Sequence, residues 1–237
     1  MLGVKLPGRK ARKDEAEKPF WISFSDLMTA LMVLFLVVMT VALLAITHEI
    51  SEADQKKVHR EEEINKLLGE IGKATKDYPG VVVRGHSIDF GDLARFDTAK
   101  HKLTDTQSSM LRSFVPKILA VVRNPLGQKW LKRVVVEGFA DQRGTYIQNL
   151  NLSLQRSERV MCVLMASNKE TPDALSEEDR HMIRDIFLVG GSSFNSLKES
   201  LDESRRIELK LEFLDIGEKR TAPRNAPLDD DPRCPLD

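Results

Sequence analysis

A long apolar run near the start of the chain constrains the fold more than any other feature, because it can cross a lipid bilayer. Residues 23–46 number 24, and as a helix rising ~1.5 Å per residue they would span about 36 Å, against ~30 Å of hydrocarbon. The run exceeds the roughly 7 to 15 apolar residues of a signal peptide, and residues 47–50 lack a small-x-small cleavage site. The sequence therefore predicts an uncleaved transmembrane helix over residues 21–46.

The charges beside this helix predict its orientation. Residues 1–20 form a basic tail, in which Lys5, Arg9, Lys10, Arg12, Lys13 and Lys18 outnumber Asp14, Glu15 and Glu17. Because basic flanks remain on the cytoplasmic side, we expect the tail in the cytoplasm and everything after residue 47 outside it. The chain is thus expected to cross a bacterial inner membrane once and to place its C-terminal domain in the periplasm.

The overall charge balance argues against nucleic acid as a direct partner. The chain has 36 basic and 36 acidic residues, and its basic cluster lies beside the membrane, where topology and attraction to anionic lipid explain it. Both cysteines, Cys162 and Cys234, would lie in an oxidising compartment. They form either a disulfide that pins the tail to the domain, or a buried apolar Cys162 with a free Cys234.

Beyond the membrane helix, composition divides the chain into a connector, one folded domain and a tail. Residues 47–78 are rich in Glu and Lys and lack proline, which predicts a connector helix, either solvated or paired with a second copy as a parallel dimer stem. Residues 79–216 are long enough for one core of ordinary size. The tail at 217–237 is acidic and rich in proline, and it cannot bury enough apolar surface to order itself.

The apolar pattern of the domain predicts an α+β fold. Residues 207–213 alternate apolar and charged side chains, which indicates a strand with one wet face and one buried face. Thr104 is the expected N-cap of a helix. The expected strands are 81–88, 134–138 and 207–213, and the expected helices are 104–122, 149–168 and 176–186.

Asp26 is the only charged residue between Trp21 and Ile46. An acid at membrane depth costs a few kcal/mol and usually faces a partner helix or an ion path. Thr29 lies on the same helix face, and Ala30 and Val33 continue that face with small side chains that allow close helix approach. Because low dielectric favours the neutral acid and water favours the ionised one, the sequence predicts a proton site, or else an interfacial acid about 7 Å inside the cytoplasmic end.

Residues 21–30, Trp-Ile-Ser-Phe-Ser-Asp-Leu-Met-Thr-Ala, resemble the transmembrane helix of B subunits in bacterial ion-driven motors. That resemblance implies five A subunits around two B subunits, with Asp26 as the proton carrier and with Ser25 and Thr29 lining its path. The residues alone do not distinguish H⁺ from Na⁺ as the ion. Within this family, the compact chain and the tract at 24–38 favour the Zorya-type branch, which serves anti-phage defence, over the flagellar stators. A passive wall tether, in which the helix is only an anchor, is the alternative from another class.

A second group of polar residues follows the strand expected at 134–138. Asp141 lies in a glycine-bearing loop, and Asn149 and Arg156 lie on the helix after it. A carboxylate and a guanidinium side by side can hold the ammonium and the carboxylate of a zwitterionic ligand. Alternatively, Asp141 and Arg156 simply pair with each other.

This second group resembles the OmpA-like peptidoglycan-binding domain, in which G-x-x-D-x-x-G is followed by N-x-x-L-S-x-x-R. The matching residues are Gly138, Asp141, Gly144, Asn149, Leu152, Ser153 and Arg156. The resemblance covers residues 81–215 and implies that Asp141 and Arg156 hold diaminopimelate of the cell wall, with Asn149, Leu152 and the weaker candidate Arg205 beside them. The chain departs from the family at residues 139–140, Phe-Ala for His-Thr, which leaves the ligand preference open.

No residue pattern predicts catalysis or a metal centre. His86, His101 and His181 lack the spacing of metal ligands. Residues 190–193, Gly-Gly-Ser-Ser, lack a nucleophile elbow and a base, and predict a flexible turn instead. We therefore expect a protein that is not an enzyme and that needs no cofactor.

Overall fold

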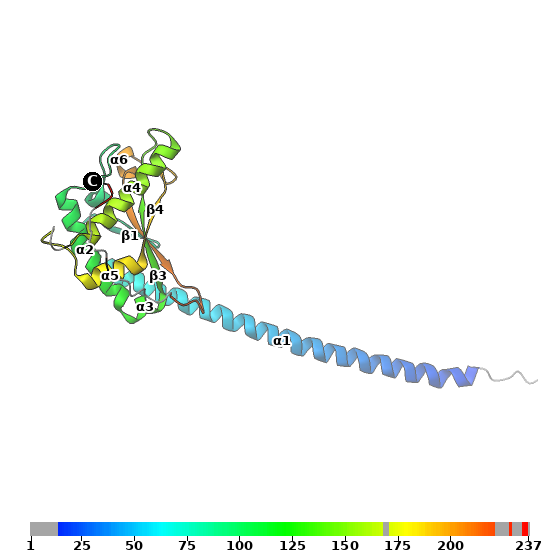
Figure 1. The fold of residues 1–237 in the computed structure, drawn as a ribbon. Helices are drawn as coiled ribbons and strands as arrows, with labels where there is room; N and C mark the ends of the chain where they lie inside the picture. The colour runs from blue at the N-terminus through cyan, green and yellow to red at the C-terminus, as the bar shows by residue number, and fades with distance from the viewer. Residues whose placement is uncertain (1–13, 168–170, 221–227, 229–233, 237) are drawn as a thin grey trace, which may run out of the picture. The chain divides into compact units, whose positions relative to one another are not determined.

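The computed structural model describes residues 14–167, 171–220, 228 and 234–236, and it divides the chain into two compact units (Figure 1). Met1–Lys57 is called the N-terminal unit and Val58–Asp237 the globular unit. The first helix, α1 (Asp14–Ala74), contributes residues to both. Each unit is described on its own.

The described part of the N-terminal unit is α1 up to Lys57, and it contains the apolar run. Among the described residues, one helix is long and apolar enough to cross a membrane, and its apolar window has no buried residue. Large side chains such as Leu34, Phe35 and Leu44 are more than half exposed along it, as suits contact with lipid. Hydroxyl groups inside the helix donate to carbonyls one turn back, as in the bond from Thr29 Oγ1 to the Ser25 carbonyl at 2.7 Å.

The globular unit is built on a five-stranded sheet in the order β1-β2-β5-β3-β4. The strands are β1 (Val82–Arg84), β2 (Ser87–Asp89), β3 (Leu131–Gly138), β4 (Phe187–Gly191) and β5 (Ile207–Phe213). All neighbours are antiparallel except β3 and β4, which run parallel. The predicted α+β class is confirmed, with a long N-terminal apolar helix beside a mixed domain.

Three main helices lie to one side of this sheet (Figure 1). They are α2 (Asp105–Arg123), α4 (Tyr146–Met165) and α5 (Glu177–Ile186), and the shorter helices are η1 (Gly91–Ala94), α3 (Pro125–Trp130) and α6 (Leu201–Ser204). Thr104 caps α2 as predicted, because its hydroxyl accepts from the Gln107 amide while the Gln107 side chain accepts from the Thr104 amide. Helix α4 begins three residues before the predicted start, because Thr145 and Gln148 form a second capping box.

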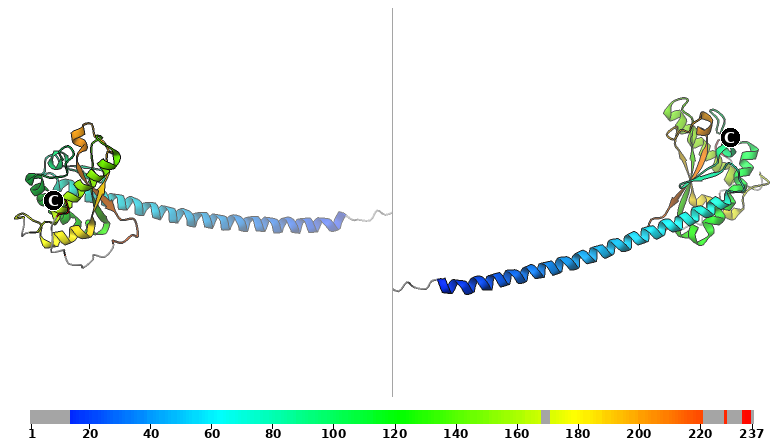
Figure 2. Two further views of the ribbon diagram at one scale, coloured as in Figure 1. Left: turned by 45° about the horizontal axis from the view of Figure 1, so that its top comes forward. Right: turned by 180° about the vertical axis from the view of Figure 1, so that it is seen from behind.

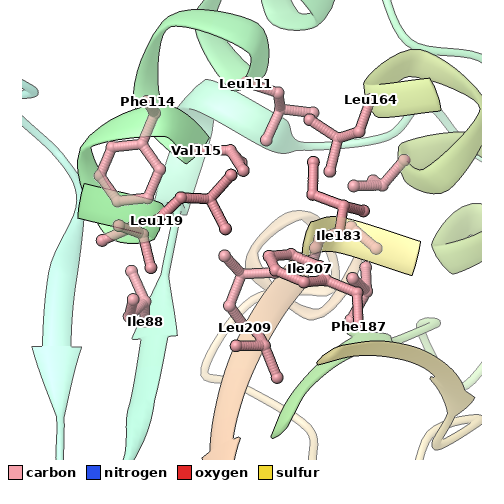
Figure 3. Packing of buried hydrophobic residues seen from close by; sticks show 14 of the residues in the cluster. Ile88, Leu111, Phe114, Val115, Leu119, Leu164, Ile183, Phe187, Ile207 and Leu209 are labelled. Atoms are coloured by element: carbon pink, nitrogen blue, oxygen red, sulfur yellow. The ribbon is translucent and has the colours of Figure 1, made fainter. Parts of the chain in front are cut away.

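The core lies between these helices and the sheet (Figure 3). Phe114 and Leu119 of α2 face Ile88 and Leu209 of the sheet, and all four are fully buried. On the other face of the sheet, cross-strand ion pairs such as Arg133 with Glu212 satisfy the charges. One wet face and one buried face is what the alternation at 207–213 predicted.

The last turns of α1 belong to the globular unit and pack against it in both views of Figure 2. Ile64, Leu67 and Ile71 are each 1% exposed, because their helical spacing places them on the face that meets the domain. The Trp130 indole donates to Glu63 at 2.6 Å, and Arg60 donates to the Leu214 carbonyl at 2.9 Å. A wholly solvated connector over residues 47–78 is therefore wrong for its second half.

Two local predictions in the globular unit need correction. The strand expected at 81–88 is a hairpin of β1 and β2, which turns at Gly85 with φ +57°. The turn expected at 190–193 begins with the end of β4, parallel to β3. Glycine fits this strand because a Cβ on Gly191 would lie 2.6 Å from the Ser153 hydroxyl of α4.

The end of the chain returns to the domain through two links. Arg220 donates to the Leu131 carbonyl through Nε at 3.0 Å and to the Gly127 carbonyl at 2.9 Å. Cys162 of α4 and Cys234 form a disulfide with their Cα atoms 5.4 Å apart. Most of the tail at 217–237, which the sequence predicts to be disordered, lies outside the described residues.

Candidate functional site

Asp26 lies on a shallow groove along α1. The groove is lined by Asp26, Thr29, Ala30, Val33, Leu34 and Val37. Asp26 has no hydrogen bond or ion pair with any residue that the structure describes, and its side chain is exposed. The groove offers an acid and small side chains on one helix face, which suits close contact with another membrane helix.

The second site begins where β3 ends and the chain turns into α4. Gly138 closes the strand, and a Cβ there would lie 2.1 Å from the Ser153 carbonyl oxygen of α4. The loop is then fixed by its own amides, because Phe139 donates to the Arg206 carbonyl at 3.0 Å and Ala140 to the Ser193 carbonyl at 2.8 Å. Asp141 is therefore held in place by backbone contacts to two distant segments.

The Asp141 carboxylate accepts five hydrogen bonds from the chain itself. Arg143 donates one through its backbone amide at 3.0 Å and three through its guanidinium. Arg205 donates the fifth through Nη1 at 3.2 Å. The Arg143 side chain is the main cause that lowers the pKa of Asp141 to about 2. Asp141 is thus an ionised acid that is only 6% exposed.

Arg156 is fully buried and holds two loops together, at 97–100 and 139–141. Its guanidinium donates to the Lys100 carbonyl at 3.0 Å, the Phe139 carbonyl at 2.7 Å and the Asp97 carbonyl at 3.1 Å. It also lies over the Phe96 ring, 5.0 Å from the centroid. Burial is the main cause that lowers the pKa of Arg156 to about 10. Its hydrogen bonds go to backbone carbonyls and not to Asp141, unlike the simple ion pair weighed from the sequence.

Arg205 was the weaker candidate from sequence, yet the structure places it directly on Asp141. Besides that contact, it donates to the Phe96 carbonyl at 2.9 Å, the Leu201 carbonyl at 3.3 Å and Asp202 at 2.6 Å. Only 8% of Arg205 is exposed. These bonds hold its guanidinium against Asp141 on the buried side of the cluster.

Asn149 and Leu152 occupy the first turns of α4 beside this group. Asn149 is 5% exposed and donates from Nδ2 to the Arg143 carbonyl at 2.8 Å, which holds the loop that carries Asp141. Leu152 is half-buried on the same helix. Asp141, Arg143, Asn149, Arg156 and Arg205 are called the Asp141 cluster below.

Sequence reasoning missed Arg143 and Arg206. Arg143 sits two residues after Asp141, and that spacing was the signal that could have found it. Arg206 is 3% exposed, lies 4.0 Å from the centroid of the Phe139 ring and donates to Glu208 at 2.7 Å. Arg206 therefore stabilises Phe139, which stands at the position before the Asp141 loop, by a cation–π contact.

Residues 8–47 match the family described as "Membrane MotB of proton-channel complex MotA/MotB". This matched stretch contains the groove of α1 and Asp26. The family match therefore falls on the membrane helix.

Several solved structures are similar to part of the chain at low identity. The OmpA-like domain of FopA1 from Francisella tularensis subsp. tularensis SCHU S4 is 20% identical, with a TM-score of 0.35, over 57% of this chain and 82% of that one. The cell wall anchor of the T6SS from Pseudomonas aeruginosa is also 20% identical, with a TM-score of 0.38, over 61% and 95%. The periplasmic domain of Helicobacter pylori MotB is 13% identical, with a TM-score of 0.36, over 56% and 82%.

A curated relative matches almost the whole chain. The protein named "Zorya protein ZorB" from Escherichia coli O139:H28 (strain E24377A / ETEC) is 42% identical over 223 residues. The match covers 93% of this chain and 91% of the relative, so both the membrane helix and the globular unit lie within it. The chain therefore belongs to the ZorB family of Zorya proteins and is a MotB-like stator subunit rather than an enzyme.

Proposed function

We propose that this chain couples an ion gradient to rotation in the bacterial inner membrane, as the B subunit of a motor that serves anti-phage defence. The observation that carries the proposal is the lone acid Asp26 on an otherwise apolar helix, in a chain whose second unit holds another acid inside a polar cluster. Asp26 lies in the membrane helix, and Asp141 lies in the unit outside the membrane. The two tasks of carrying ions and holding the wall are thus assigned to separate units.

Asp26 carries the ion in this proposal, and H⁺ is the ion. A carboxyl group between packed helices favours its neutral form, and contact with water favours its ionised form. The membrane potential supplies ~2.3 kcal/mol per charge per 100 mV, which is enough to bias a conformational step with each proton. Ser25 and Thr29 lie within one turn of Asp26 and line its path.

The exposed groove around Asp26 needs neighbouring helices, and these are supplied by partner subunits. The proposed partners are a MotA-like A subunit, five copies around two copies of this chain, and a second copy of this chain. Asp26 is the single charged residue of the apolar run at 23–46, and the apolar window of this helix has no buried residue. This supports an assembly of this kind, because the acid would otherwise face lipid.

The globular unit holds the motor to peptidoglycan in the periplasm. The Asp141 cluster offers a fixed carboxylate beside guanidinium groups, which matches the paired charges of diaminopimelate. Asp141 binds the ammonium group, and Asn149, Leu152, Arg156 and Arg205 shape the site around it. The basic tail remains in the cytoplasm, as its charges predict.

The test is protection against phage by cells that carry Asp26→Asn. We expect this variant to lose protection completely at a normal level of membrane-inserted protein, because the amide cannot release a proton. Asp26→Glu is the matched control and keeps part of the protection. Full protection by Asp26→Asn would instead support a passive wall tether.

A further inference from the structure

We propose that Arg143 selects the ligand of the globular unit: its guanidinium covers Asp141 in the free protein and exchanges Asp141 for the carboxylate of a zwitterionic ligand. This inference rests on the proposed binding of peptidoglycan. It adds Arg143, which competes with the ammonium of the ligand for Asp141 and pairs with the carboxylate of the ligand. The resulting specificity is for an ammonium and a free carboxylate on the same carbon atom.

The first step of the argument is that Asp141 is already saturated. Four of its five hydrogen bonds come from Arg143 and one from Arg205. With the residue 6% exposed, an incoming ammonium cannot reach both carboxylate oxygens unless a guanidinium leaves. Protonation does not open the site near neutral pH, since Arg143 and Arg205 hold the pKa of Asp141 at about 2.

The second step is that the two guanidinium groups differ in freedom. Arg205 has a side chain only 10% exposed and makes three further hydrogen bonds within the domain. Arg143 has a side chain 48% exposed, and its further hydrogen bond goes to Thr98 at 3.1 Å. Thr98 lies in an exposed loop, and Gly144 follows Arg143 with φ +93°. Arg143 is therefore the group that can move.

The third step concerns the carboxylate of the ligand. Arg156 is 0% exposed, and three backbone carbonyls already accept from its Nε, Nη1 and Nη2 atoms. Reorienting it towards a ligand would leave those carbonyls without their donor. Arg143 reaches solvent, so it is the guanidinium available to a carboxylate once it leaves Asp141. Arg156 is then a positioning residue that fixes the loops at 97–100 and 139–141.

This exchange makes a chemical distinction between wall peptides. Diaminopimelate carries an ammonium for Asp141 and a free carboxylate for Arg143. An amidated diaminopimelate has a neutral amide in place of that carboxylate, and the lysine side chain ends in an ammonium with no carboxylate on the same carbon atom. Both of these peptides must displace Arg143 without giving it a new ionic partner.

The experiment measures affinity of the full chain, purified in detergent, for three synthetic stem peptides. The peptides carry diaminopimelate, its amidated form or lysine at the same internal position, so that they differ only in the group beside the side-chain ammonium. We expect the wild-type chain to prefer the free diaminopimelate peptide by about tenfold, as one charge-assisted hydrogen bond implies. In Arg143→Ala the preference falls below about threefold, and the lysine peptide binds more tightly than it does to wild type, because the competitor is gone.

Two further variants separate the effect of the Arg143 charge from that of removing any arginine. Arg143→Gln removes the charge but keeps a hydrogen-bonding side chain, and it should behave as Arg143→Ala does. Arg84→Ala, which removes an exposed arginine of β1 outside the cluster, should leave all three affinities unchanged.

The Arg143 proposal is overturned if Arg143→Ala keeps the tenfold preference or does not bind the lysine peptide more tightly than wild type does. If instead the wild-type chain binds none of the peptides, and Asp141→Ala changes nothing, peptidoglycan binding itself is overturned.

Discussion

The globular unit satisfies its buried charges from within the chain, whereas the N-terminal unit carries an acid that no described residue meets. Asp141 accepts five hydrogen bonds and is 6% exposed, while Asp26 is exposed on a helix face lined by small and apolar side chains. The difference shows that the globular unit supplies the partners of Asp141 itself, whereas the N-terminal unit supplies none for Asp26 among the described residues. A self-contained cluster can fold before it meets a ligand, but a lone acid in an apolar helix requires other subunits.

Removing the arginine at the centre of the cluster should have the largest effect on stability. Arg156→Ala leaves three backbone carbonyls without a donor and a cavity beside Phe96, so we expect the free energy of unfolding to fall by about 3 to 5 kcal/mol. Chemical denaturation followed by the fluorescence of Trp130 measures it. A loss below about 1 kcal/mol would show that the cluster does not hold the loops together.

A methyl group at the junction of β3 and α4 should have a somewhat smaller effect. Gly138→Ala places a Cβ 2.1 Å from the Ser153 carbonyl oxygen, and we expect a loss of about 3 kcal/mol because backbone must shift. Gly69→Ala on α1 is the matched control, since nothing lies within 4 Å of its new Cβ. That change should stabilise the helix by up to about 1 kcal/mol. Equal effects at the two sites would contradict the close packing of strand and helix.

The pH dependence of Asp141 should give the smallest stability effect. Its pKa is about 2 in the folded chain against an ordinary 3.8, so its contribution is present above pH ~4 and is lost as the pH falls towards 2. Wild type should therefore exceed Asp141→Asn by about 2 kcal/mol near neutral pH, and the gap should close in acid. Asp26→Asn, which removes no hydrogen bond or ion pair with a described residue, should leave the unfolding of the globular unit unchanged at every pH.

Local pattern predicted the parts of the fold that depend on local interactions. The apolar run around Asp26, the cap at Thr104 and the alternation at 207–213 each follow from neighbours along the chain. Arg205 was found in another way, through the resemblance to a late motif of the OmpA-like domain. That resemblance, and not the local pattern, placed an acid and this arginine in one site.

The parts that the sequence could not predict depend on distant segments. Burial of Arg156 requires the carbonyls of residues 97, 100 and 139, which two loops far apart in the sequence supply. The docking of Ile64 and Ile71 requires a surface that the domain forms later in the chain. The two glycines of β4 look like a turn until α4 is packed against them. Arg143 belongs to no helical or strand pattern, and its position two residues after Asp141 was the one local signal for it.

The most direct test of the central claim is proton uptake into proteoliposomes that contain this chain with its motor A subunit. An imposed membrane potential drives the uptake, and a pH-sensitive dye inside the vesicles reports it. We expect uptake with the wild-type chain and with Asp141→Ala, and none above background with Asp26→Asn. Uptake by Asp26→Asn at the wild-type rate would contradict the assignment of ion transport to the membrane helix.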